Sequence, residues 1–345
     1  MTDAPKADPQ QTHVGSQWKH ARPLTACRFD PSGKYVFTGA EDNLVTRWDI
    51  ASGTATPLAA HDSWVRAIAF TPGGDTVITG GYDGRVIWWP AAADKPEPLR
   101  KLGPAHNGWV RALAVNPEGT RLVSVGNDNL VKLWDVADGR LVGELAGHES
   151  HVYNVAFHPA DGTFVTCDLK CNLKQWDLAA GTPRRDLAAA ALHKYDTTFR
   201  ADIGGARSIA FSRDGKQLAL GGMTNCSNAF AGIGNIAVVV LDWESGKQVV
   251  QYEAKDKVNG LAWGLRQHPD RFWIGLGGGG GGGWFYFWKD VPMGAAPKES
   301  TTAQEFFKFK LPDSGRDLDL HPDNLRLAVA HADGNLRLYQ LHKKA

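Results

Sequence analysis

The sequence is poor in cysteine. Its four cysteines, Cys27, Cys167, Cys171 and Cys226, are scattered over 345 residues. Wide spacing in so long a chain argues against a disulfide scaffold. Cys167 and Cys171 lie close in sequence, but no second Cys/His pair with zinc-like spacing is near them. We therefore expect ordinary thiols, no metal site and no small-molecule cofactor.

Long hydrophobic runs are also missing. No apolar stretch reaches the ~18 residues that a membrane span requires. The first seventeen residues, MTDAPKADPQQTHVGSQ, are polar and lack the apolar core of a secretory signal. These observations predict a soluble protein of the cytoplasm without a membrane partner.

An excess of charge of one sign is absent as well. The chain has 38 Lys+Arg against 37 Asp+Glu, a net charge of +1. A nearly neutral chain gives no global reason to expect nucleic acid as the partner. A basic surface can still exist locally, so it has to be argued from individual positions.

Glycine and tryptophan are abundant, with 39 and 13 residues. One type of strand ending recurs along the chain: RWDI (47–50), WWPA (88–91), LWDV (133–136), QWDL (175–178), VLDW (240–243), FWKD (287–290) and LYQL (338–341). The segments before these endings, such as VRAIAF and RLVSVG, alternate or run apolar over strand lengths, and turns such as TPGG and NPEG separate them. The sequence therefore consists of seven units of about four short strands each.

Four side chains recur at fixed distances within these units. A turn residue lies six positions before the Trp, Leu or Tyr at the second position of each ending. In the first four units a hydroxyl precedes the turn by four positions and a histidine precedes it by 22. Three complete sets are His20, Thr38, Asp42 and Trp48; His61, Thr79, Asp83 and Trp89; and His106, Ser124, Asp128 and Trp134. The fourth unit keeps His148, Thr166 and Trp176 but has Lys170 at the turn position.

The period of 40–45 residues, the early histidine and the Trp-Asp ending resemble the WD-repeat family. The resemblance implies an all-β fold, a seven-bladed β-propeller over about residues 12–342 with short tails at 1–11 and 343–345. It also implies that the last blade, with three strands of its own, takes its fourth strand from about residues 12–18. In this family the recurring Asp, His, hydroxyl and Trp form a hydrogen-bonded network within a blade. Because the set recurs, we interpret it as structural and not as a Ser-His-Asp catalytic site.

Units five and six depart from the pattern. Unit five carries two insertions, about residues 181–205 and 222–234, which the propeller topology predicts to meet on one face. The sequence leaves two alternatives for these insertions: they have a function, or they are loop extensions that the fold tolerates. Unit six contains seven consecutive glycines, Gly277–Gly283, without a following GK[ST] or helix. We interpret this tract as a flexible hairpin turn and not as a phosphate-binding loop.

The resemblance implies a partner-binding face around the central opening, at the positions three and five residues after the histidine and one before the turn. The residue five after the histidine is Thr25, Arg66, Arg111, Tyr153, Arg207, Asn259 or Arg316. The candidate binding residues are Trp64, Arg66, Tyr82, Trp109, Arg111, Tyr153, Arg207 and Arg316. Arginine with Trp and Tyr is typical of protein interfaces, and arginine binds carboxylate or phosphate with forked hydrogen bonds. We hypothesise an acidic or phosphorylated peptide as ligand. The alternative is that local acids such as Glu41, Asp62 and Asp202 neutralise these arginines, or that the arginines stack on the neighbouring tryptophans.

Three functions compete at this point. The leading hypothesis is a non-catalytic scaffold that binds other proteins. A propeller hydrolase of the lactonase type is an alternative, but it needs an off-pattern Asp/Glu/His/Asn cluster in the channel, and the sequence offers none that convinces. A nucleic-acid-binding propeller is the other alternative, because arginine and aromatic side chains suit single strands, although the overall charge disfavours it.

Overall fold

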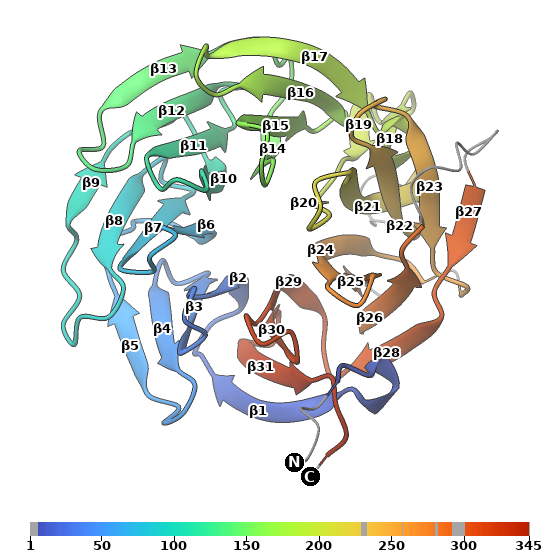
Figure 1. The fold of residues 1–345 in the computed structure, drawn as a ribbon, viewed down its shortest axis with the longest axis horizontal. Helices are drawn as coiled ribbons and strands as arrows, with labels where there is room; N and C mark the ends of the chain where they lie inside the picture. The colour runs from blue at the N-terminus through green and yellow to red at the C-terminus, as the bar shows by residue number, and fades with distance from the viewer. Residues whose placement is uncertain (1–5, 229–232, 257, 280–281, 292–300, 345) are drawn as a thin grey trace.

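The computed structural model describes residues 6–228, 233–256, 258–279, 282–291 and 301–344. It contains seven mixed or antiparallel sheets arranged as blades around a central channel (Figure 1), together with one two-stranded hairpin. The protein is therefore a seven-bladed β-propeller, as predicted. Lys257, Gly280 and Gly281, the insertion residues 229–232, and residues 1–5 and 345 of the tails lie outside the described part.

The first four blades follow one another along the chain, each with its innermost strand first. Blade one contains β2 (Leu24–Phe29), β3 (Tyr35–Ala40), β4 (Val45–Asp49) and β5 (Ala55–Leu58). Blade two contains β6 (Val65–Phe70), β7 (Thr76–Gly81), β8 (Val86–Pro90) and β9 (Arg100–Leu102). Blade three contains β10 (Val110–Val115), β11 (Arg121–Gly126), β12 (Val131–Asp135) and β13 (Leu141–Leu145). Blade four contains β14 (Val152–Phe157), β15 (Thr163–Asp168), β16 (Asn172–Asp177) and β17 (Thr182–Ala188).

The last three blades are less regular. Blade five contains β20 (Ser208–Phe211), β21 (Gln217–Asn228), β22 (Ile233–Asp242), β23 (Gln248–Glu253) and β27 (Thr301–Gln304). Blade six contains β24 (Leu261–His268), β25 (Phe272–Gly279), β26 (Gly282–Lys289) and β28 (Phe307–Leu311). Blade seven contains β29 (Gly315–Leu320), β30 (Arg326–His331), β31 (Asn335–Gln340) and β1 (His13–Lys19). Strand β27 is parallel to β23 and gives blade five a fifth strand. A 3₁₀ turn, η1 (Pro9–Gln11), precedes β1.

The N-terminal strand closes the ring. Strand β1 pairs antiparallel with β31, from His13 opposite Gln340 to Lys19 opposite Asn335, and the two lie side by side in Figure 1. Trp18 on β1 also stacks on Trp48 of blade one, with 6.3 Å between ring centroids. Strand pairing and stacking thus join the two ends of the propeller and leave β31 without an open edge.

Tight turns follow from the residues after the repeated turn aspartates. Asn43, Gly84, Asn129 and Gly334 all have positive φ, between 66° and 82°. Asparagine and glycine are the residues that adopt this left-handed conformation at low cost. In blade four the same place is taken by Cys171, with φ 59°, so the hairpin geometry is kept although the sequence motif is lost.

The core lies between neighbouring blades. Each large apolar cluster combines strands of two adjacent blades, as in the cluster of Phe37, Ile68, Val77 and Trp89, all at most 6% exposed. Such burial is the main stabilising contribution in a propeller, because a single blade cannot cover its own faces. The rigid ring then fixes the positions of the innermost strands, and these strands line the channel.

Histidines in three turns add hydrogen bonds between blades. The Nε2 atom of His158 lies 3.1 Å from the carbonyl oxygen of Gly215, that of His268 lies 2.8 Å from Asn324 O, and that of His321 lies 2.9 Å from Gly33 O. In each ring Nδ1 accepts a hydrogen bond from a backbone N–H two residues on. These contacts tie blades four to five, six to seven and seven to one.

The described glycines of the tract in blade six belong to the two strands of a hairpin, and the expected turn between them lies outside the described residues. Gly277, Gly278 and Gly279 are strand residues of β25, and Gly278 pairs with Gly283 of β26. A Cβ on Gly278 would lie 2.7 Å from the carbonyl oxygen of Gly315, and one on Gly283 would overlap the carbonyl of Asp313. These glycines therefore allow blades six and seven to approach closely.

The two insertions of blade five have different structures. Residues Thr182–Ala188 of the first belong to β17, and the remainder forms η2 (Ala190–Leu192) and a hairpin of β18 (His193–Asp196) and β19 (Ala201–Gly204). The second insertion lengthens β21 and β22 and does not form a separate loop within its described residues. Among the residues that the structure describes, no helix has the length and apolar character needed to cross a membrane.

Candidate binding site at the channel mouth

A β-bulge at the start of the innermost strand creates the site. The register shifts around one residue in six blades, and the bulged residues are Thr25, Arg66, Arg111, Tyr153, Trp263 and Arg316. A bulge leaves one residue outside the ladder and redirects its side chain. In blade five Arg207 directly precedes β20, and its N–H donates to Gly221 O at 2.7 Å. We call these seven residues the mouth ring.

The mouth ring differs from the sequence alignment in blade six. Spacing alone predicts Asn259 for this blade, but the bulge of β24 falls at Trp263. Asn259 instead forms an isolated bridge with Asn235 of blade five. The longer β24 hairpin moves the start of the blade by four residues, so counting from a missing histidine gives the wrong position. Trp263 is therefore a ring residue that the sequence analysis missed.

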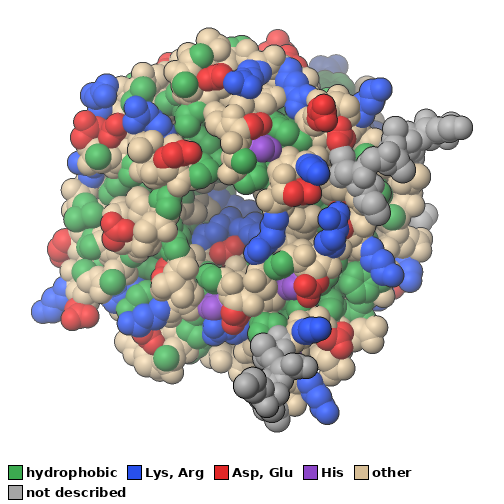
Figure 2. Space-filling view, viewed as in Figure 1, with side chains coloured by type: hydrophobic (Ala, Val, Ile, Leu, Met, Phe, Trp, Pro, Cys, Tyr) green, Lys and Arg blue, Asp and Glu red, His purple; other side chains and the backbone are tan. Residues whose placement is uncertain are grey.

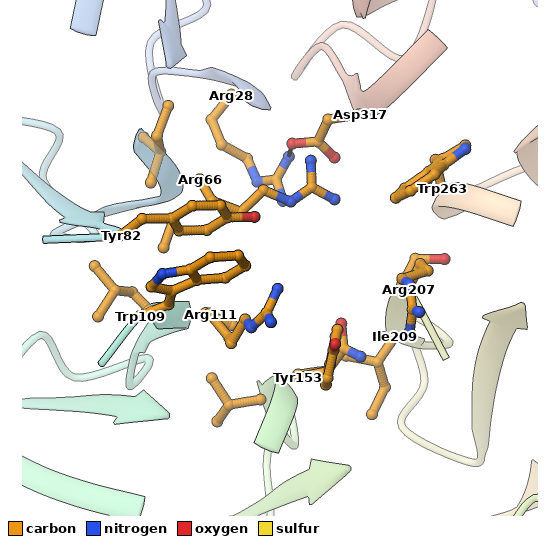
Figure 3. Close-up of a pocket in the computed structure, with 18 of the residues that line it drawn as sticks. Arg28, Arg66, Tyr82, Trp109, Arg111, Tyr153, Arg207, Ile209, Trp263 and Asp317 are labelled. Atoms are coloured by element: carbon orange, nitrogen blue, oxygen red, sulfur yellow. Dashed lines mark hydrogen bonds and ion pairs between the residues drawn. The ribbon is translucent and has the colours of Figure 1, made fainter. Parts of the chain in front are cut away.

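A cavity of about 350 Å³ lies below the mouth ring. Residues of all seven blades line it, and Arg28 is the contribution of blade one. Figure 3 shows Arg66, Arg111 and Arg207 reaching into it from blades two, three and five. In the space-filling view, Lys/Arg side chains are visible inside the central opening and on one side of it (Figure 2). The volume of the cavity, about 350 Å³, is at the lower end of the range of small-ligand pockets.

Three arginines at the cavity have carboxylate partners. Arg28 Nη1 lies 2.6 Å from Asp317 Oδ2, and burial of Arg28 opposes its charge while Asp317 and Asp319 raise its pKa overall. Arg266 Nε lies 2.8 Å from Asp319 Oδ1, and Arg316 is paired with Glu41. The charges of these three arginines are thus balanced within the protein.

Three other arginines have no carboxylate partner within the described part of the chain. Arg66 donates from Nη1 to the carbonyl oxygens of Thr25 and Arg316. Arg111 donates from Nε to Asn127 Oδ1 at 2.7 Å. Arg207 has a buried Nη1 atom without a hydrogen-bond partner. Its burial lowers its pKa, and the nearby positive charges of Arg111 and Arg66 lower it further. The mouth therefore carries a local positive charge on a nearly neutral protein.

Aromatic side chains form a continuous stack beside these arginines. Trp64 and Tyr82 have ring centroids 6.0 Å apart, and Tyr82 and Trp109 lie 3.9 Å apart and nearly parallel. Arg111 continues the stack, 4.5 Å from the centroid of Trp109 and 4.3 Å from that of Tyr153. Trp64 and Trp109 remain 41% and 40% exposed. The structure thus brings the predicted aromatic and arginine residues of blades two to four together on one surface.

The acids that were expected to neutralise the arginines act differently. Glu41 pairs with Arg316, as considered. Asp62 pairs instead with Arg85 at 2.5 Å. Asp202 contacts His193 and Lys170, at 2.8 and 3.9 Å. Local neutralisation therefore holds for Arg316 and does not extend to Arg66, Arg111 or Arg207.

The insertions of blade five meet beside the mouth. Lys194 of β18 donates to the carbonyl oxygen of Cys226 in the second insertion at 3.1 Å. Ile203, Met223 and Cys226 form a small buried cluster between them. The contact of Asp202 with Lys170 ties the hairpin to the turn of blade four. The inserted hairpin therefore packs against the second insertion and the turn of blade four.

The recurring histidine sets are hydrogen-bonded networks inside the blades. In blade two, His61 contacts Asp83 at 3.0 Å and Thr79 at 2.9 Å, and Trp89 Nε1 donates to Thr79 Oγ1 at 2.9 Å. In blade three, His106, Ser124, Asp128 and Trp134 repeat this arrangement. Burial opposes ionisation of Asp83, but the hydrogen bond and charge of His61 and the backbone N–H groups of Asp62 and Arg85 together lower the pKa of Asp83.

The first set is arranged differently. His20 contacts Asp42 through Nε2 at 2.8 Å, whereas Trp48 Nε1 donates to Thr38 at 2.9 Å. Within the described residues no hydrogen bond joins His20 to Thr38. The four side chains of blade one thus form two separate pairs.

Blade four replaces its missing turn aspartate with Asp168, two residues before Lys170. Asp168 lies 3.2 Å from His148 Nδ1, and His148 Nε2 lies 2.7 Å from Thr166 Oγ1. Sequence reasoning missed Asp168 because the interval from the histidine is 20 residues here and 22 elsewhere. Blade seven uses another solution, in which Tyr339 donates to His331 at 3.0 Å and His331 donates to Asp313 O.

Cysteine and metal chemistry were also considered. Cys27, Cys167, Cys171 and Cys226 are free and buried. Burial raises the pKa of the Cys27 thiol. In the described ranges no group of three or more His, Cys, Asp or Glu side chains is placed to hold a metal ion.

The sequence was compared with known proteins. The profile of the family "WD domain, G-beta repeat" (WD40) matches residues 11–49, 54–90, 96–135 and 139–177. Each matched segment contains the outermost strand of one blade and the three inner strands of the next, so the four segments together contain β1 to β16. A comparison with curated proteins gave no match. WD40 propellers typically serve as scaffolds for protein–protein interactions. The chain thus contains four WD40 repeats within a seven-bladed β-propeller.

Proposed function

We propose that this protein is a non-catalytic scaffold that binds an acidic segment of a partner protein at the channel mouth. The observation that carries the proposal is the set of Arg66, Arg111 and Arg207, which face one cavity without carboxylate partners. An anionic side chain of a partner would supply the missing charges with forked hydrogen bonds.

The aromatic stack supports a protein partner. Trp64 and Trp109 present large apolar surfaces to solvent next to Arg111. Trp, Tyr and Arg are the residues that most often dominate the binding energy of protein interfaces. Such a surface suits a peptide that places an apolar side chain on the tryptophans and an acidic one over the cavity.

The test is affinity capture from the cell that makes the protein. Full-length wild type is compared with an Arg66→Gln/Arg111→Gln double variant, both checked by circular dichroism and thermal unfolding. Arg121→Gln/Arg140→Gln is the matched control, because it removes the same charge at the opposite end of blade three, where Arg121 pairs with Asp135 and Arg140 is largely exposed.

The proposal predicts proteins that the wild type and the control retain and the Arg66/Arg111 variant loses. Capture is repeated after nuclease treatment and at raised salt, because nucleic-acid binding would disappear with nuclease and fall steeply with salt. Identical protein lists for all three chains would contradict the assigned surface.

A further inference from the structure

Tyr153 separates two arginines that have no carboxylate partners. Arg111 lies over its ring at 4.3 Å and Arg207 at 4.5 Å from the centroid, and Figure 3 shows Tyr153 between them. Tyr153 itself is a bulge residue of the mouth ring. Two guanidinium groups are thus held close together by stacking, without a carboxylate to offset their repulsion among the described residues.

This arrangement is electrostatically unfavourable as it stands. Arg207 is partly buried, and its Nη1 atom has neither solvent contact nor a hydrogen-bond partner. Unpaired buried charge is costly, and neighbouring like charges add to the cost. Arg111 and Arg66 are close enough to lower the pKa of Arg207. Groups held in this way are characteristic of binding sites more than of structural positions.

The three arginines are also held in place before any ligand binds. Arg111 is stacked between Trp109 and Tyr153 and anchored through Nε to Asn127. Arg66 is anchored through Nη1 to the backbone carbonyls of Thr25 in blade one and Arg316 in blade seven. Little conformational freedom remains to be lost on binding, and the other guanidinium N–H groups are not used within the described structure.

The chemistry of these donors favours one class of anion. A phosphoryl group carries a charge of about −2 and three acceptor oxygens in a tetrahedral arrangement, whereas a carboxylate carries one charge and two coplanar oxygens. Three guanidinium groups from blades two, three and five approach from three directions. A cavity of about 350 Å³ also has room for the group that carries the phosphate.

We propose that Arg66, Arg111 and Arg207 form a seat for a phosphoryl group in the central cavity. The inference rests on the proposed function in one respect, because the phosphoryl group would belong to the bound segment of the partner. A free phosphorylated small molecule has the same chemistry and is distinguished by experiment.

The seat is tested with the full-length protein and inorganic phosphate. Thermal unfolding and isothermal titration are measured in phosphate, acetate and chloride at equal ionic strength. At millimolar phosphate concentrations above the dissociation constant, phosphate is expected to raise the melting temperature of the wild type by at least ~1 °C. Acetate is expected to leave the melting temperature unchanged. Arg121→Gln, which keeps the cavity intact, should show the same rise.

Two variants separate binding from folding. Arg207→Met retains an extended side chain over Tyr153 but removes the unpaired charge, so it should melt at or above the wild-type temperature without phosphate and lose the phosphate-dependent rise. Arg111→Gln should weaken phosphate binding at least tenfold. Equal shifts with acetate and phosphate, or a full phosphate shift in both variants, would overturn the seat.

A last arm identifies the source of the phosphoryl group. Captured partner is treated with phosphatase and rebound to the wild type. A tenfold or greater loss assigns the group to the partner, whereas retained binding together with a specific phosphate shift assigns it to a free small molecule. If phosphate has no specific effect and phosphatase changes nothing, the seat is wrong, yet capture that depends on Arg66 and Arg111 leaves the scaffold proposal standing. If phosphate gives a specific shift but capture does not depend on Arg66 and Arg111, the phosphoryl seat stands and the scaffold proposal is wrong.

Discussion

The guanidinium of Arg207 stacks on the ring of Tyr153, 4.5 Å from its centroid, while Arg111 occupies the other face of the ring. One aromatic side chain thus positions two cations that come from blades three and five. The relationship places a residue of blade four at the centre of the proposed site.

Tyr153 is therefore predicted to act as a positioning residue. Tyr153→Ala removes both cation–π contacts, each worth about 0.5–2 kcal/mol, and should weaken binding of phosphate and of the captured partner about tenfold. Tyr153→Phe keeps the ring and should bind like the wild type. Titration calorimetry measures both. Equal loss in the two variants would mean that the hydroxyl, and not the stacking, is required.

Blade four gives a prediction about stability. Asp168 accepts hydrogen bonds from His148 and from the backbone N–H groups of Lys170 and Asn172. Asp168→Ala would leave these buried donors unpaired and should lower the free energy of unfolding by about 2–4 kcal/mol. Lys170→Ala, which removes a 3.9 Å pair with Asp202, should change it by less than about 0.5 kcal/mol. Urea unfolding measures both, and a larger effect of Lys170→Ala would contradict the assignment.

Stability should depend on pH through buried histidines. Burial first, and Arg337 next, lowers the pKa of His331 to about 4, and burial lowers that of His268. An unfolded histidine has a pKa of about 6.5, so between these values the unfolded chain binds more protons. The contribution of His331 is complete above pH 6.5 and is lost as pH falls from 6.5 towards 4, by about 3 kcal/mol.

The expected pH dependence is measured by urea unfolding at several values from pH 7 to 4.5. His331→Gln should make the profile flatter. Half-buried aspartates such as Asp333, whose pKa is lowered to about 2, contribute in a lower pH window, below the unfolded pKa of about 3.9. A wild-type profile that is level over this range, or one that His331→Gln leaves equally steep, would show that the buried histidine does not set it.

Ring closure gives a further prediction. Deletion of residues 1–19 removes β1 and exposes the edge of β31, so the melting temperature should fall and aggregation should rise. A synthetic peptide of residues 8–19 added in trans should restore part of the loss. An unchanged melting temperature after the deletion would contradict closure by this strand.

Most of the fold could be predicted because the repeated spacing of turn residues and strand endings indicates the number and boundaries of the blades. The spacing of Asp42, Asp83 and Asp128 from their endings marks the hairpins of three blades, and the short last unit indicates closure by the N-terminal strand. The degenerate blades were harder. Asp168 and Trp263 perform their tasks at shifted positions, and a count along the chain cannot follow a shift that three-dimensional pairing corrects.

The site was predictable in composition but not in its charge balance. The sequence names Arg66, Arg111, Arg207 and Arg316 as one set. Only the folded chain shows that Glu41 reaches Arg316 whereas Asp62 turns to Arg85. Such pairing depends on side-chain directions between blades, and no local pattern specifies them.

Site-specific photo-cross-linking would test the account most directly. A photoreactive phenylalanine analogue replaces Trp109 at the mouth or, as the control, Leu141 on the outer strand β13, which is similarly exposed at 43%. Both proteins are irradiated in the cell that makes them. If the partner binds at the channel mouth, we expect a cross-linked partner protein from position 109 and no such product from position 141. Adding Arg66→Gln should abolish the product from position 109. The same product from position 141 alone would place the partner on the side of the propeller and contradict a binding site at the channel mouth.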